Sequence, residues 1–168
     1  RLDFIGANRL GRALFSEMLD AAIAPANAAR FVFLDPRAQT FYQDWPSNTR
    51  QIVAILRAEA GRSPYDRRLS DLVGELSTRS ELFRRLWGAH DVKEHRTGLK
   101  SIHHPIVGDL TLTYQSMDLA SDRDLQMLAF SAEPGSESHD RLQILANWAE
   151  TNDAEMRRDA IERDAPQP

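Results

Sequence analysis

The side chains of this sequence best suited to chemistry are its five histidines, because imidazole serves both as an acid–base group and as a metal ligand. They are His90, His95, His103, His104 and His139. A metal site would combine His90, Asp91 and His95 with one histidine of the later pair. However, His90 and His95 are five residues apart, whereas two ligands on one helical face need a spacing of four. His103 and His104 are adjacent, so in a strand they point to opposite faces. The spacing favours histidines that hydrogen-bond where helices meet a sheet, and a small metal-dependent hydrolase is the weaker alternative.

General catalytic motifs are missing from the sequence. It has no cysteine, which excludes disulfides, thiolate metal sites and a cysteine nucleophile. It has no G-x-S-x-G nucleophile turn and no glycine-rich phosphate loop. Acidic pairs such as Asp3 with Glu17 have no surroundings that indicate shared proton chemistry. We therefore expect neither an enzyme nor a cofactor.

Large apolar side chains are more informative than the polar ones. The set comprises Phe31, Phe33, Phe41, Tyr42, Trp45, Phe83, Trp87, Tyr114 and Phe130. The simplest interpretation of each is core packing. The functional interpretation is that some of them line a cavity between helices and a sheet, because small-molecule sites are mostly apolar hollows with a few polar groups.

Length and charge restrict the class of protein. The 168 residues suit one domain with one core. The net charge of −4 argues against this segment gripping DNA, which usually takes a basic surface. Arg79, Arg84 and Arg85 lie close together in the sequence, but a solvated helix face explains them better than a phosphate contact. No apolar run is long enough for a membrane span and no signal-peptide pattern opens the chain, so we expect a cytoplasmic location and no membrane partner.

Apolar spacing predicts several helices that would position these groups. The expected helices begin near Leu10, near Ser47 and at Asp66, with a further one capped by Ser80. Their apolar stripes are Leu10, Leu14 and Met18, then Ile52, Ile55 and Leu56, then Leu69, Leu72, Val73 and Leu76, and finally Leu82, Phe83, Leu86 and Trp87. Asn27 is expected to cap a short turn that leads into Phe31–Leu34.

Alternation predicts a sheet in the second half of the chain. Leu110, Leu112 and Tyr114 alternate with polar residues, as in a strand with one buried face. Further strands are expected at Leu125–Ala132 and Lys93–His104, with an edge or first strand at Leu2–Ala7. Arg141–Thr151 is predicted to be a closing helix, followed by a charged tail or exposed helix. The expected fold is α+β, with helices packed on one face of a mostly antiparallel sheet.

One long stretch, Arg57–Gly108, carries a family resemblance beyond these patterns. It contains H-D-V, G-L-K and H-P-I-V-G, and the chain also has N-A-A-R-F-V-F-L-D-P at Asn27–Pro36, D-W at Asp44–Trp45 and A-E-P-G-S at Ala132–Ser136. From about Leu2 to Ala149 the chain resembles the MmyB-like ligand-binding domain. That domain is the C-terminal sensor half of bacterial helix-turn-helix regulators of the XRE class.

The resemblance implies a PAS-like sensor domain over residues 1–151, with a charged C-terminal tail at 152–168 and no metal. In the family a helix-turn-helix domain precedes the sensor, and the chain shows no counterpart of it. We therefore expect DNA to be a partner only through that N-terminal domain, and we expect a homodimer. A ligand-independent dimerisation module with a solid core is the alternative function.

The resemblance also implies a small apolar ligand, such as a fatty acid. Its tail would need a dry slot, where each buried methylene contributes about 0.8 kcal/mol. Its carboxylate would need a charge-assisted donor, for which Arg57, His95 and Lys100 are the candidates. The predicted inward faces supply the slot: Phe33, Leu56, Leu72, Leu76, Phe83, Trp87, Leu112, Tyr114 and Met127.

Overall fold

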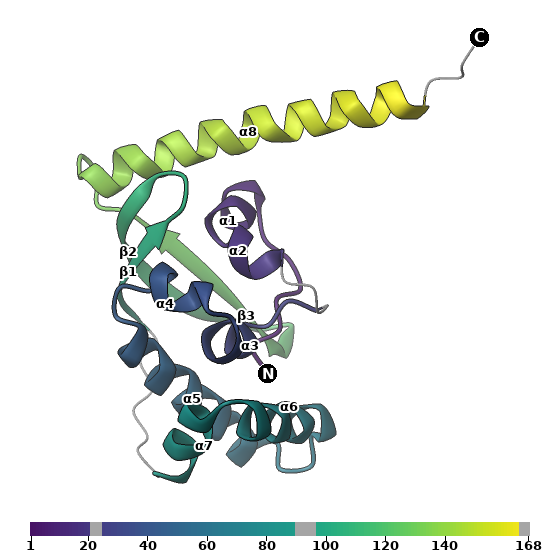
Figure 1. Ribbon diagram of the computed structural model, residues 1–168, viewed down its shortest axis with the longest axis vertical. Helices are drawn as coiled ribbons and strands as arrows, with labels where there is room; N and C mark the ends of the chain where they lie inside the picture. Colours follow the sequence, from purple (N-terminus) through teal and green to yellow (C-terminus); the bar gives the residue numbers. More distant parts are fainter. Residues whose placement is uncertain (21–24, 90–96, 165–168) are drawn as a thin grey trace.

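The chain folds into a three-stranded sheet surrounded by helices, as Figure 1 shows for a computed structural model that describes residues 1–20, 25–89 and 97–164. The sheet is an antiparallel meander of order β1-β2-β3, formed by β1 (Thr97–His104), β2 (Gly108–Leu119) and β3 (Asp122–Ser131). Gly108 has a φ of +74°, which lets the chain turn from β1 into β2. The predicted α+β class is confirmed, and the PAS-like part of the expectation stays a prediction.

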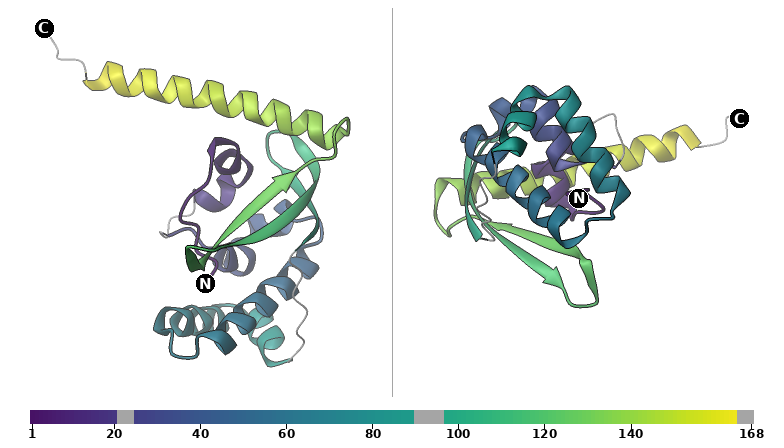
Figure 2. Two further views of the ribbon diagram at one scale, coloured as in Figure 1. Left: turned by 180° about the vertical axis from the view of Figure 1, so that it is seen from behind. Right: turned by 90° about the horizontal axis from the view of Figure 1, so that it is seen from below.

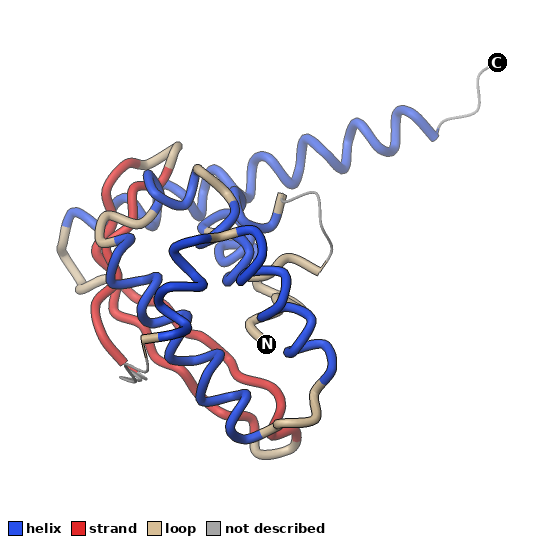
Figure 3. Tube along the Cα trace, turned by 60° about the horizontal axis from the view of Figure 1, so that its bottom comes forward, coloured by secondary structure: helices blue, strands red, loops and turns tan. Residues whose placement is uncertain are grey.

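The helices lie along the sheet and at both of its ends (Figures 1 and 2). Their bounds are α1 (Arg9–Leu14), α2 (Ser16–Leu19), α3 (Ala28–Leu34), α4 (Arg37–Phe41), α5 (Trp45–Arg62), α6 (Arg67–Arg79), α7 (Glu81–Gly88) and α8 (Glu137–Asp164). Helices α1 to α4 lie along the sheet, and α5, α6 and α7 occupy one end of it. Helix α8 crosses the other end, beside α1 and α2, and extends well past the body of the protein (Figure 3).

The first core lies between the inner face of the sheet and helices α1 to α4 and α8. Ile102, Leu110 and Leu112 project from the sheet into this core and are at most 1% exposed. Phe15 and Phe41 pack against each other there, with ring centroids 6.0 Å apart. The alternation predicted for the second strand is therefore confirmed, because every second residue of β2 from Leu110 to Tyr114 is buried.

The buried residues of the second core come from α3, α5, α6 and α7. The predicted stripe of α6 points into it, since Leu69, Leu72 and Leu76 are all buried. Asp66 caps α6 by accepting hydrogen bonds from the backbone amides of Arg68 and Leu69, which confirms the expected start of this helix. Ser80 caps α7 in the same way through the amide of Phe83.

Other predictions need correction. Leu2–Ala7 is not a strand, because only Asp3 makes a bridge, to Asn27. Asn27 is a cap as expected, but it caps helix α3 rather than a short turn, and Phe31–Leu34 is the second half of that helix. The helix expected from Ser47 begins earlier, at Trp45, because Asp44 is its cap. Lys93–Arg96 of the predicted third strand lie outside the described residues.

The C-terminal helix is longer than the closing helix predicted at Arg141–Thr151. Leu145 and Ala149 face the first core. Arg9 of α1 forms salt bridges with Glu150 and Asp153, both at 3.3 Å. These contacts fasten α8 to α1 beyond the edge of the core, and the helix then continues to Asp164.

Candidate functional site

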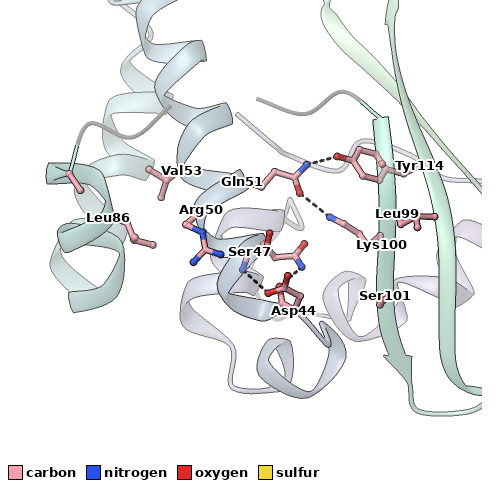
Figure 4. A pocket seen from close by; sticks show the side chains of 13 residues that line it. Asp44, Ser47, Arg50, Gln51, Val53, Leu86, Leu99, Lys100, Ser101 and Tyr114 are labelled. Carbon is pink, nitrogen blue, oxygen red and sulfur yellow. Dashed lines mark hydrogen bonds between the residues drawn. The ribbon is translucent and has the colours of Figure 1, made fainter. Parts of the chain in front are cut away.

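A cavity of about 680 Å³ lies between the first half of α5 and the edge strand β1. Its volume falls in the range of small-molecule sites. Figure 4 shows Gln51 of α5 and Lys100 of β1 facing one another across it. It is lined by Asp44, Ser47, Asn48, Arg50, Gln51, Val53, Leu86, Ala89, Gly98, Leu99, Lys100, Ser101 and Tyr114.

The start of α5 determines which side chains reach the cavity. The Asp44 carboxylate accepts a hydrogen bond from the backbone amide of Ser47 at 3.1 Å, which fixes the first turn. Asn48 donates its side-chain amide to the Asp44 carbonyl at 2.9 Å. Ser47 and Gln51 are four residues apart and so lie on the same face of the helix. This face, rather than the apolar stripe, is turned toward β1 (Figure 4).

Lys100 of β1 is one of three described charged residues that line the cavity, with Asp44 and Arg50 of the α5 wall. Its Nζ lies 3.4 Å from Oε1 of Gln51 and 5.3 and 5.4 Å from the ring centroids of Tyr42 and Tyr114. No carboxylate of the described residues lies within ion-pair distance of this ammonium group. Burial lowers the pKa of Lys100 from 10.5 to about 8, because removing the ammonium from water disfavours the charged form.

Gln51 links the two walls of the cavity. Its side-chain amide donates to the hydroxyl of Tyr114 on β2 at 2.7 Å, while its carbonyl accepts from Lys100. Burial also raises the pKa of the Tyr42 hydroxyl, so Tyr42 stays neutral beneath the lysine. A group that displaced Gln51 from Lys100 would therefore act on α5 and on both neighbouring strands.

Most of the predicted ligand-binding residues lie in the second core. Leu56, Leu76 and Phe83 are 0% exposed and Leu72 is 3% exposed. Phe33 and Trp87 cover Phe83 on either side, with ring centroids 5.0 and 5.5 Å away. None of these six residues lines the cavity between α5 and β1, and their part in ligand binding stays a prediction.

The remaining predicted residues are scattered. Tyr114 lines the cavity, and Leu112 is buried in the first core. Met127 is 52% exposed, so the expectation that it faces inward is wrong. This residue lies where the β2–β3 hairpin projects beyond the helices, as the right panel of Figure 2 shows for the hairpin.

The three residues predicted to donate a hydrogen bond to a ligand carboxylate lie in different places. Lys100 lines the cavity, whereas His95 lies outside the described residues. Arg57 donates to the carbonyls of Leu86 and Trp87, and its guanidinium lies 5.3 Å from the centroid of the Trp87 ring. Arg57 thus closes the C-terminal end of α7.

Sequence reasoning missed the polar wall contributed by α5. On this helix only the apolar stripe was given a role, and Ser47 was expected to mark the helix start, so Arg50 and Gln51 were not considered. The D-W motif at Asp44–Trp45 was the available signal, since Asp44 starts the helix. The position of β1 opposite this face could not be read from local spacing.

The histidines do not assemble a metal site in the described part of the chain. His103 pairs with Asp109 at 2.6 Å on the exposed side, while His104 is buried and contacts the Ala13 carbonyl at 3.0 Å. Burial lowers the pKa of His104. No group of three potential metal ligands occurs among the described residues, and His90 and His95 lie outside them.

Comparison with known proteins places the chain in a family. No helix within the described ranges is both long and apolar enough to cross a membrane. A comparison with curated proteins found no match. The sequence profile of the MmyB-like transcription regulator ligand binding domain matches residues 1–145, which is most of the chain. The chain therefore belongs to the MmyB-like ligand-binding domains of transcription regulators.

Proposed function

We propose that this domain senses a small carboxylate-bearing molecule with an apolar chain, such as a fatty acid, in the cavity between α5 and β1. The DNA-binding function belongs to another domain of the regulator, a helix-turn-helix of the XRE class. The sensor acts inside the cell, as part of a homodimer. Binding would shift the regulator between two states by favouring the state whose cavity fits the ligand.

The observation that carries the proposal is the position of Lys100. A partly buried ammonium normally has a carboxylate partner, because burying an unpaired charge is costly. Lys100 instead has an amide oxygen and two aromatic rings around it. A ligand carboxylate would complete this site with a charge-assisted hydrogen bond.

The apolar chain of the ligand would contact the apolar part of the cavity wall. Val53, Leu86 and Ala89 line the cavity, so part of its wall is apolar. Each methylene that these groups remove from water contributes about 0.8 kcal/mol. Affinity should rise with chain length until the chain leaves the apolar wall.

The ligand would reach the rest of the domain through α5. A carboxylate at Lys100 competes with the Gln51 carbonyl, and Gln51 also holds Tyr114. The C-terminal half of the same helix packs in the second core and holds α7 through Arg57. Binding would thus change the position of α5 between the sheet and the helices at the end of the domain.

The test measures binding of saturated fatty acids of increasing length by isothermal titration calorimetry at pH 7. Lys100→Met should weaken binding at least tenfold, because it removes the cation while keeping the bulk of the side chain. Arg67→Met is the matched control: it removes one positive charge from α6, which does not line the cavity. The absence of binding at any chain length, or an equal loss in both variants, would refute the proposal.

A ligand-independent dimerisation module is the second candidate function. Ile144 and Trp148 lie four residues apart on α8 and are 57% and 39% exposed. Such a pair on one helical face suits contact with another chain. Sedimentation of the wild type and of Ile144→Glu distinguishes the candidates: a dimer that depends on Ile144 and ignores fatty acids would favour the second.

A further inference from the structure

We propose that Lys100 also captures aldehydes, forming a reversible imine with a ligand that carries a short apolar chain. The inference rests on the proposed function in that both place a ligand in the same cavity. It differs in the reacting group, because an imine requires the neutral amine whereas a carboxylate requires the ammonium.

The choice of a lysine at this position is the first observation. Only two of the 21 basic residues in the sequence are lysines, Lys93 and Lys100, and the other 19 are arginines. A guanidinium stays protonated in proteins and pairs well with carboxylates, whereas an amine can lose its proton and act as a nucleophile. The chain thus has a potential nucleophile at position 100, where arginine, its commoner basic residue, could not attack an aldehyde.

The surroundings of the amine are the second observation. The cavity gives an aldehyde access to Nζ, and the Tyr42 and Tyr114 rings shield it on two sides. Desolvation is one of the ways in which proteins activate a lysine to form a Schiff base. With a pKa of about 8, roughly a tenth of the Lys100 amine is neutral at pH 7, far more than for an ordinary lysine.

The reaction is balanced without any further reagent. The lone pair of neutral Nζ attacks the aldehyde carbon and forms a C–N bond, and the carbonyl electron pair moves to oxygen. Transfer of a proton from nitrogen to that oxygen gives the carbinolamine. Loss of the hydroxyl with the second nitrogen proton, as water, leaves the imine, and water reverses every step.

Polar and apolar groups of the wall select the aldehyde. Val53 and Leu86 lie across the cavity from Lys100 (Figure 4). They suit a chain of a few carbons next to the carbonyl. Gln51, which bonds to Lys100 through its carbonyl oxygen, would lose this contact when the imine forms.

Hexanal with cyanoborohydride tests the inference, because the reductant fixes the imine as a stable secondary amine. Peptide mapping by mass spectrometry should find the added hexyl group on Lys100. Lys100→Arg should lose this label and retain only the background on Lys93 and the terminal amine, while Lys93→Arg should keep it. The labelling rate should rise through a pH of about 8, and hexanoate should compete with hexanal for the site.

The outcomes separate this inference from the proposed function. Hexanoate binding without label on Lys100 would overturn the imine and leave the carboxylate sensor standing. Label on Lys100 without binding of any fatty acid would support the imine and overturn the carboxylate sensor. Labelling at Lys100 that hexanoate does not reduce and that rises only near pH 10.5 would mark an ordinary surface amine, and would also overturn the inference.

Discussion

Helix α5 borders two regions of opposite character, a closed apolar core and a partly polar cavity. On one side Leu56 is fully buried in a core closed by aromatic rings. On the other side Gln51 faces a cavity whose wall mixes polar and apolar groups. The closed side contributes stability, whereas the open side holds an ammonium without a carboxylate partner in the described structure. Departures from good core chemistry of this kind are expected at functional sites, where stability is given up for binding.

The largest expected effect comes from breaking the closed side. Phe83→Ala removes a ring that contacts both Phe33 and Trp87, and should lower the free energy of unfolding by about 4 kcal/mol. Urea unfolding followed by circular dichroism measures the loss. If the second core is only a scaffold, the variant should bind ligand at 10 °C with an affinity within a few-fold of the wild type. A loss of binding in the folded variant would place the ligand in the second core, where most of the predicted ligand-binding residues lie.

The next effect concerns the arginine that closes α7. Arg57→Met keeps the aliphatic stem but removes the hydrogen bonds to the carbonyls of Leu86 and Trp87, which should cost about 2 kcal/mol of stability. Calorimetry of ligand binding provides the contrast with Lys100→Met. We expect Arg57→Met to change stability much more than affinity, and the opposite result would make Arg57 the carboxylate donor.

In contrast to Arg57, Lys100 should contribute to binding and cost stability. Its folded-state pKa of about 8 lies below the ordinary 10.5, so the unfolded chain binds more protons between these values. The free energy of unfolding should therefore rise with pH from about 8 to 10, and Lys100→Met should flatten this slope. At pH 7 the same variant should be more stable by on the order of 1 kcal/mol. Above pH 10 the buried Tyr42, with its raised pKa, acts in the opposite direction.

The smallest effect is expected from the link between the two walls. Gln51→Leu removes the hydrogen bonds to Tyr114 and Lys100 and should lower stability by about 1 kcal/mol or less. Fatty-acid affinity should change little or rise, because the ligand no longer competes with the Gln51 carbonyl. A strong loss of affinity would show instead that Gln51 contacts the ligand directly.

The closed region could be predicted from the sequence and the open region could not. Leu69, Leu72 and Leu76 follow helical spacing, and Asp66 and Ser80 are caps three residues or fewer from the amides they bind. Such interactions are local, so their spacing is visible in the chain. The cavity joins Gln51 to Tyr114, 63 residues away, and no local pattern encodes that distance. The prediction that Met127 faces inward failed for a related reason: alternation along a strand cannot show that a hairpin projects past the helices that would cover it.

The sequence by itself determined the α+β class, the helical stripes with their caps, the alternation of β2 and the family to which the domain belongs. These follow from periods of 3.6 and 2 residues and from short motifs, which hold wherever the element is placed. Only the tertiary structure decided that the polar face of α5 meets β1 and that Lys100 lies between two tyrosines with no described carboxylate partner. The physical reason is that burial and charge pairing depend on which elements come together, and that choice is made by the packing of the whole domain.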